Sequence, residues 1–343
     1  MSGMDYFGSG TNQEIDDRGS VLPGYVPYLS LVFKLTATLV NMLLVGWVVY
    51  TIKTTRNLHR PHNIFVANLL TSGILYTLSG TLLSGAMMIG YQLGVEFFIS
   101  CDPWKLRTLP FYVSITSFVI IAADKVIAVT SPFKYNRTMT PRVVTAIVGG
   151  AWLLAIIPTA YAFIDGGDGV NEVPEYGTCS FDGKGYAQLV FIIMIPTFVA
   201  SILTMILNIY LAMKAYQVHK QIEKETKLSG HNSQSDNLAA LKKKQHRIRQ
   251  NRKPIITLLV VISGYIFIAL FFIPVQVLGR LLIDSQIYQD LMDYVVSPNM
   301  ELVLQFYSVL VYGLYFKQVR EPMMKRLRRL LRINKFNSVA PQP

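Results

Sequence analysis

Long apolar blocks separated by short polar segments constrain this chain more than any other feature. A helix that crosses a membrane needs about 20 mostly apolar residues. Backbone polar groups cannot stay unpaired in lipid, so such blocks cross it as helices. We predict seven spans, at residues 27–51, 64–90, 104–129, 143–164, 186–214, 255–279 and 288–314. The predicted fold class is therefore all-α, an integral membrane bundle of seven transmembrane helices.

The composition agrees with a membrane protein. Only 15% of the residues are charged and 52% are hydrophobic, whereas a soluble domain has about 25% charged residues. The net charge of +12 is also typical of a nucleic-acid-binding protein. The basic residues, however, lie between the apolar blocks and do not form one basic domain. We therefore predict that they orient the chain in a membrane, with no nucleic-acid partner.

The distribution of basic residues predicts the orientation. With the N-terminus outside, 26 of the 32 Lys and Arg residues fall in inner segments. Inner loops carry this excess in membrane proteins, so the C-terminus is predicted to be cytoplasmic. Residues 1–26 are then an extracellular tail, 27–314 the bundle, and 315–343 an inner segment.

The inner segment contains a stretch, 317–335, that combines many basic residues with leucines and methionines at helical spacing. Such a pattern predicts an amphipathic helix that lies flat on the membrane surface and contacts its lipid. Pro322 is expected in the first turn of this helix, where proline is tolerated.

The chain has two cysteines, Cys101 and Cys179. In the predicted topology both lie outside, one at the mouth of the third span and one in the second outer loop. That compartment permits disulfides. The two cysteines either pair with each other, which would tie the loop over the bundle mouth, or each stays unpaired.

A charged pair interrupts the apolar run from Ser117 to Tyr135. Asp124 and Lys125 stand side by side in it, followed by Pro132 and a basic segment. Charges in such a run are costly unless they lie at the end of a span or inside a bundle. The pair is therefore either a functional element at the inner end of the third span or a solvated interfacial ion pair of small energetic value.

Several short motifs are distributed along the chain. They are Asn63-Ile64-Phe65-Val66-Ala67-Asn68-Leu69, the cysteines, Asp124-Lys125-Val126 with Pro132 and Tyr135, Trp152, Pro158, Pro196, Phe271-Phe272-Ile273-Pro274, and Tyr312-Gly313-Leu314. From about residue 27 to 335, this order resembles that of the rhodopsin-like (class A) G-protein-coupled receptors. The resemblance implies a plasma-membrane receptor that transmits an extracellular ligand signal to a heterotrimeric G protein.

The resemblance also implies roles for individual residues. Cys101 and Cys179 match the family disulfide. Asp124 and Lys125 match a switch in which the cation pairs with its neighbouring acid at rest and then reorients toward the G protein, and Tyr312 belongs to the same switch. The remaining matches are helix kinks and an aromatic toggle, at Pro196, Phe271, Phe272 and Pro274. An ordinary lipid-facing position is the alternative for Phe272.

Several family residues are replaced. Lys125 stands for the family arginine and Phe272 for its tryptophan. Ser308 and Val309 replace the Asn-Pro pair that precedes Tyr312. Gly73 aligns with the second-helix aspartate, so the usual sodium pocket has lost its main anion. These changes keep open a receptor-fold protein that binds a ligand or a partner receptor without activating a G protein.

Two charged residues are candidates for the ligand pocket. Arg107 lies 18 residues before Lys125, which is about 27 Å along a helix and near the outer surface. Glu301 lies within the seventh span, where a charge indicates function. Either Arg107 binds an anionic ligand group, or Glu301 binds a cationic amine, or the two pair and only hold the bundle together. No aspartate near Arg107 matches the aminergic site, and the seventh span has no lysine for retinal.

Catalytic and cofactor patterns are missing from the sequence. The five His and two Cys form no Ser/His/Asp grouping and no metal-ligand spacing, and no phosphate-binding loop occurs. We therefore predict neither an enzyme nor a cofactor. A transporter or channel is a further alternative, but it would favour internal repeats, and none is visible.

Overall fold

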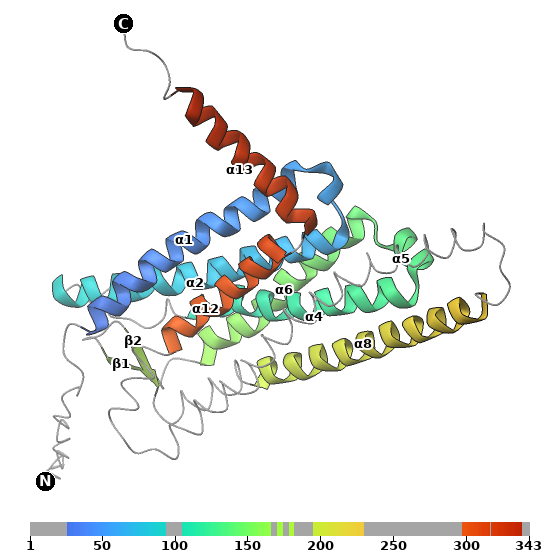
Figure 1. The fold of residues 1–343 in the computed structure, drawn as a ribbon. Coiled ribbons are helices and arrows are strands. Elements are labelled where there is room, and N and C mark those ends of the chain that lie inside the picture. The colour runs from blue at the N-terminus through green and yellow to red at the C-terminus, as the bar shows by residue number, and fades with distance from the viewer. Residues whose placement is uncertain are drawn as a thin grey trace, which may run out of the picture.

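The computed structural model describes residues 26–93, 105–165, 170–173, 178–181, 195–229, 297–315 and 317–337. Within these ranges the chain is almost entirely helical (Figure 1). Its helical elements are α1 (Val26–Thr54), the short 3-10 helix η1 (Arg56–Leu58), α2 (Pro61–Leu93), α4 (Thr108–Thr130), α5 (Pro132–Thr138), α6 (Pro141–Asp165), α8 (Ile195–Ser229), α12 (Ser297–Val309), the π-helical turn η7 (Leu310–Tyr315) and α13 (Lys317–Asn337).

Five of the predicted spans coincide with helices long and apolar enough to cross a membrane. These stretches are Tyr28–Thr54, Pro61–Ala86, Thr108–Thr130, Pro141–Phe163 and Ile195–Lys214. The sixth predicted span, 255–279, lies outside the described residues. The described part of the seventh consists of α12 and η7.

Prolines begin three of the helices. Pro61, Pro132 and Pro141 are the first residues of α2, α5 and α6. Proline suits this position because the N–H it lacks would have no partner inside the helix, and because its φ angle is already helical. The hydropathy pattern did not predict the short helix α5, but Pro132 marks its start directly after α4.

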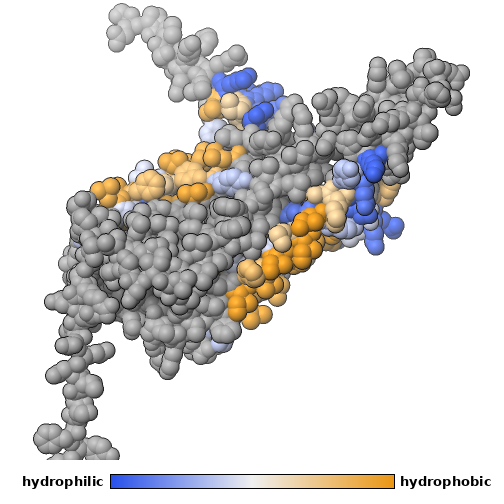
Figure 2. All heavy atoms as spheres, turned by 60° about the horizontal axis from the view of Figure 1, so that its bottom comes forward, coloured by the Kyte–Doolittle hydropathy of each residue, from blue (hydrophilic) through white to orange (hydrophobic). Residues whose placement is uncertain are grey.

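α4 is the centre of the described bundle and packs against α2, α6 and α8, while α1 packs against α2 and α12. The largest fully buried apolar side chains come from several of these helices and include Phe65, Leu70, Ile121 and Leu211. The outer faces are apolar as well: Figure 2 shows hydrophobic side chains along α1 and α8. Apolar residues on both faces are what a bundle surrounded by lipid requires.

The second outer loop contains a β-hairpin. Strands β1 (Val170–Val173) and β2 (Thr178–Phe181) pair antiparallel, with Glu172 opposite Cys179. The sequence predicted only a loop rich in glycine and acid here. The hairpin places Cys179 in a strand, whereas Cys101 lies outside the described residues.

α13 confirms the predicted amphipathic helix, but the position of its proline differs from the prediction. The helix begins at Lys317, so Pro322 is its sixth residue and lies inside it rather than in the first turn. The chain passes from η7 into α13 before it reaches the proline, and the buried side chain of Val319 fixes this first turn to the bundle core. Beyond it, α13 points away from the bundle (Figure 1).

Candidate functional site

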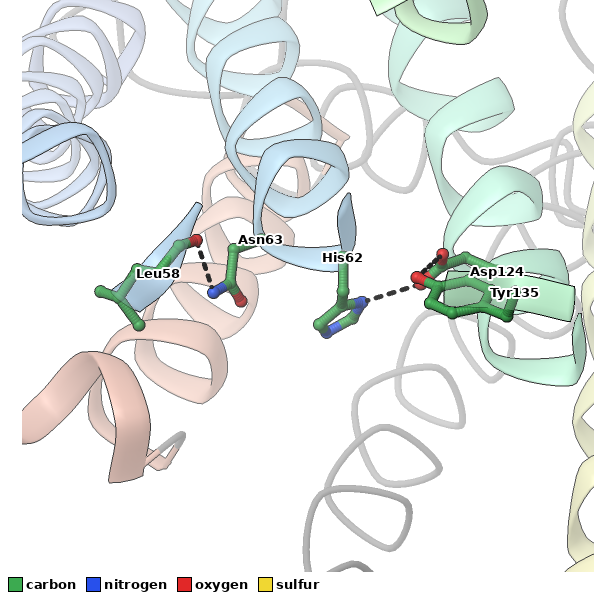
Figure 3. A network of polar contacts seen from close by, with 5 residues as sticks. All are labelled: Leu58, His62, Asn63, Asp124 and Tyr135. Carbon is green, nitrogen blue, oxygen red and sulfur yellow. Dashed lines mark hydrogen bonds and ion pairs between the residues drawn. The ribbon is translucent and has the colours of Figure 1, made fainter. Parts of the chain in front are cut away.

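One carboxylate is buried at the end of the bundle where α4 meets α5, which we call the inner end because the charge distribution predicts that it faces the cytoplasm. Asp124 lies in the last two turns of α4 and is 2% exposed. Tyr135 of α5 reaches back to it, and the tyrosine hydroxyl donates a 2.6 Å hydrogen bond to Asp124 Oδ1 (Figure 3). A buried carboxylate needs such a donor because removing a charge from water is costly. The bond thus fixes α5 to α4.

The protonation of Tyr135 keeps this bond in place. Burial, and then the hydrogen bond to the Asp124 carboxylate and its negative charge, raise the pKa of Tyr135 well above its usual value. The phenol therefore stays protonated at physiological pH and remains a donor.

α2 makes a second contact with the buried carboxylate. His62 Nδ1 lies 3.6 Å from Asp124 Oδ2, which is an ion pair only when the imidazole is protonated and is too long for a neutral hydrogen bond. The neighbouring Asn63 turns the other way, and its Nδ2 donates a 2.9 Å bond to the Leu58 carbonyl (Figure 3). The first turn of α2 is thus bonded to η1 and lies close to α4.

Lys125, the family's switch cation in the sequence-based hypothesis, follows Asp124 directly. Its side chain is half-buried, and no ion pair joins it to Asp124 among the residues that the structure describes. The resemblance implied that this cation pairs with its neighbouring acid at rest. Here the hydroxyl of Tyr135 occupies that acid instead, and the role of Lys125 as a switch stays a prediction.

Tyr312, the retained tyrosine of the seventh helix, is 2% exposed and lies in the π-helical turn η7. π-helical turns are rare and are frequently found at functional sites. In this turn the next residue, Gly313, lies against α1: a Cβ atom at Gly313 would be 3.0 Å from Val48 Cγ2. A side chain at Gly313 would therefore require Val48 to shift by a few tenths of an ångström, and Val309, where the family has proline, precedes the turn.

The space beside Gly73 is filled from the seventh helix. A Cβ atom at this position would lie only 2.1 Å from Nε2 and 2.3 Å from Oε1 of Gln305. The side-chain amide of Gln305 on α12 thus packs directly on the α2 backbone where the resemblance implies an aspartate. A neutral amide has taken the place of the missing anion.

A chain of hydrogen bonds joins α2, α4 and α6 in mid-bundle. The indole Nε1 of Trp152 donates a 3.0 Å bond to Asn68 Oδ1, and Asn68 Nδ2 donates a 2.9 Å bond to Ser117 Oγ. An indole N–H inside an apolar bundle needs an acceptor, so Trp152 predicts a polar neighbour. Asn68, which lies inside the second-helix motif, is that neighbour.

The opposite end of α4, which we call the outer end, buries a cation. Arg107 precedes the first residue of α4 and is 7% exposed. Its guanidinium lies over the Tyr76 ring, with Cζ 4.6 Å from the ring centroid. A Cβ atom at Gly80 would lie 2.4 Å from one of its terminal nitrogens. Two α2 residues therefore line the outer seat, as we call the position of the Arg107 guanidinium. Tyr76 contacts it through its ring face, and Gly80 leaves room for it because it has no side chain.

The structure does not describe how the remaining predicted site residues lie relative to Arg107. Glu301 lies on α12, but its side chain is outside the described residues, and Phe271, Phe272 and Pro274 are outside them entirely. Pro196 is the second residue of the described part of α8. The ligand-pocket pair, the toggle, the kinks and the disulfide therefore stay predictions.

Sequence reasoning missed several contacts that define these sites. Hydropathy could not rank His62, Tyr76 or Gln305 above other polar residues of the spans. Tyr135 belongs to one of the sequence motifs, but the resemblance implies Lys125 as the partner of Asp124 and gives no sign of the Tyr135 hydrogen bond.

The family described as 7 transmembrane receptor (rhodopsin family) matches residues 45–314. This match covers more than half of the chain. The chain belongs to this family. Crystallised squid rhodopsin has a similar fold, with a TM-score of 0.67 and 16% identity, covering 89% of this chain and 81% of the squid chain. At that identity the likeness shows the fold alone, which is the rhodopsin-like seven-transmembrane bundle.

Curated relatives of this receptor match over shorter stretches. The D(1B) dopamine receptor of Xenopus laevis is 29% identical over 154 residues, which are 43% of this chain and 32% of the relative. The octopamine receptor 1 of Lymnaea stagnalis is 26% identical over 148 residues, 40% of this chain and 22% of the relative. The match thus spans less than a third of the length of each of these relatives. The receptor is a distant, multi-pass membrane member of the family and not an enzyme.

Proposed function

We propose that this receptor transmits an extracellular ligand signal through its bundle to a heterotrimeric G protein at the inner end. Membership of the rhodopsin family over residues 45–314 carries the proposal. Lys125 supports it, because no ion pair joins its amino group to Asp124 in the described structure, whereas Tyr135 donates a hydrogen bond to that carboxylate. The Lys125 amino group can therefore form charge-assisted hydrogen bonds with carbonyl or carboxylate groups of an inner partner.

The test is ligand-independent G-protein activation in cells, across a panel of G-protein classes, at matched surface expression. Lys125→Ala should lower basal activity about tenfold, since a charge-assisted hydrogen bond would be lost. Lys134→Ala, which removes an exposed cation of α5, is the matched control and should leave it unchanged. An equal decrease in both variants would assign the effect to net charge and contradict the proposal for Lys125.

For the ligand, we propose a molecule with an anionic group, such as a carboxylate, that binds near Arg107. Two of the matched relatives are named for the amines octopamine and dopamine. This receptor instead has a buried arginine seated on Tyr76 and Gly80 at the outer end of α4. Guanidinium recognises carboxylate and phosphate groups through paired hydrogen bonds.

Two hypotheses compete with an anionic ligand at Arg107. In one, Glu301 binds an amine ligand, and in the other, Glu301 and Arg107 form a structural ion pair. A panel of small carboxylates and amines, assayed for activation of wild type, Arg107→Gln and Glu301→Gln, separates the three. Carboxylate responses lost only in Arg107→Gln support the proposal, and amine responses lost only in Glu301→Gln contradict it. Equal loss of stability in both single variants and in the double variant would indicate a structural pair.

A receptor-fold protein that does not signal is the second candidate. The Gln305 amide favours it, because it fills the space beside Gly73 where the resemblance implies an aspartate. Silence across the whole G-protein panel, with normal surface display and with a ligand found by binding, would favour this candidate.

A further inference from the structure

An apolar groove lies between α1, the end of the seventh helix and α13. It has a volume of about 220 Å³ and is lined by Leu43, Leu44, Trp47, Val48, Val309, Leu310, Gly313, Met323 and Leu327. Its floor is closed by the buried Val48 and Val309, while Leu43 at its rim is 75% exposed. The groove therefore opens sideways, toward the surrounding lipid.

The rim of the groove toward the inner end is cationic. Arg326 of α13 donates hydrogen bonds to the hydroxyls of Thr54 and Thr55, and its guanidinium lies 5.3 Å from the centroid of the Tyr50 ring. These contacts use part of its five N–H donors. Exposed basic residues flank Arg326 on the same helix, namely Lys325, Arg328 and Arg329. Figure 2 shows the apolar surface of α1 running up to hydrophilic side chains of α13.

Trp47 adds an unpaired donor to the groove wall. Its indole Nε1 is screened from water and has no hydrogen-bond acceptor in the described part of the chain. A buried donor without an acceptor is costly, by more than the bond itself would gain. Trp47 lies three residues before Tyr50, about 4.5 Å along α1, and so close to the level at which Arg326 is fixed.

We propose that this groove binds an anionic glycerophospholipid of the inner leaflet. One acyl chain fills the groove, an ester carbonyl accepts the Trp47 hydrogen bond, and the phosphate lies near Arg326. In a glycerophospholipid the phosphate and the nearest ester carbonyl are separated by a few bonds. This separation is similar to the distance along α1 between Tyr50, which Arg326 contacts, and Trp47. Both cysteines lie before residue 180, so α13 has no thiol for an acyl chain of its own. The chain in the groove must therefore come from the bilayer. The inference is independent of signalling and of the ligand.

Photolabelling of the full-length purified receptor in detergent micelles tests the proposal. The probe is phosphatidylserine with a diazirine on one acyl chain, compared with phosphatidylcholine carrying the same chain, and labelled residues are located by mass spectrometry. We expect labels at residues 43–48, 309–313 and 323–327. Phosphatidylserine should give about fivefold more label than phosphatidylcholine, from attraction to basic residues, and this ratio should fall at high salt.

Two variants test the groove itself. Leu43→Trp should fill it and abolish labelling, whereas the control Leu153→Trp, at a 68% exposed position on α6, should not. Trp47→Phe should lower phosphatidylserine labelling about fivefold, because only the donor is removed. Equal labelling by both lipids, or labelling that survives Leu43→Trp, would overturn the proposal. Cross-links from these residues to a second receptor molecule would overturn it as well, and would assign the groove to receptor association.

Discussion

Both ends of α4 bury a charged side chain, Asp124 at the inner end and Arg107 at the outer end, and the contacts described around the two differ. At the inner end, Asp124 is held by a short hydrogen bond from Tyr135 and lies near His62. At the outer end, Arg107 lies on the Tyr76 ring and in the space that Gly80 leaves open. The contacts described at the inner end include a directional hydrogen bond, and those described at the outer end include a ring face and close packing against a glycine. Substitutions should therefore affect the two ends differently.

The largest effect is expected at the inner end. Tyr135→Phe removes the donor to a buried carboxylate and should lower the free energy of unfolding by about 2 kcal/mol, the scale of a hydrogen bond to a charged group. Tyr216→Phe, at an exposed tyrosine of α8, is the control and should leave it unchanged. The comparison is made by thermal melting of the purified receptors in detergent. Equal melting temperatures would show that this bond does not stabilise the inner end.

A smaller loss is expected when the outer seat is filled. Gly80→Ala places a methyl group against the Arg107 guanidinium, and overpacking of this kind costs about 1.5 kcal/mol. Gly149→Ala, where nothing lies within 4 Å of the added Cβ, should be neutral or slightly stabilising. If both variants melt alike, shape complementarity at Gly80 has no energetic role.

Arg107→Lys tests whether the positive charge or the stacking on Tyr76 stabilises the outer end. The charge remains but the planar stacking on Tyr76 is lost, so we expect a loss of about 1 kcal/mol. Arg142→Lys changes an exposed arginine on α6 in the same way and should have no effect. Wild-type melting of Arg107→Lys would indicate that charge alone fixes the seat.

The smallest effect is expected from His62→Gln. The 3.6 Å contact between His62 and Asp124 is too long to contribute a neutral hydrogen bond, so near neutral pH the cost should stay below about 0.5 kcal/mol. A loss as large as that of Tyr135→Phe would mean that the imidazole is charged and shares the carboxylate with Tyr135.

The sequence predicted the helices of this receptor well, because their signal is local. Apolar length and amphipathic spacing require no knowledge of neighbours, so five of the predicted spans and α13 were placed correctly. Contacts between helices have no such local signal. The packing of Gln305 on Gly73 and of Arg107 on Gly80 depends on which glycine faces which long side chain. The position of Pro322 was mispredicted for the same reason. α13 begins earlier than expected, at Lys317, where the buried side chain of Val319 contacts the core.

The proposed mechanism depends most on the hydrogen bond from Tyr135 to Asp124, because Asp124 then forms no ion pair with Lys125. Two double-mutant cycles on thermal stability test it directly, one for Asp124→Asn with Tyr135→Phe and one for Asp124→Asn with Lys125→Ala. We expect a coupling energy of about 1–2 kcal/mol in the first cycle and close to zero in the second. Strong coupling between Asp124 and Lys125, with none to Tyr135, would contradict it.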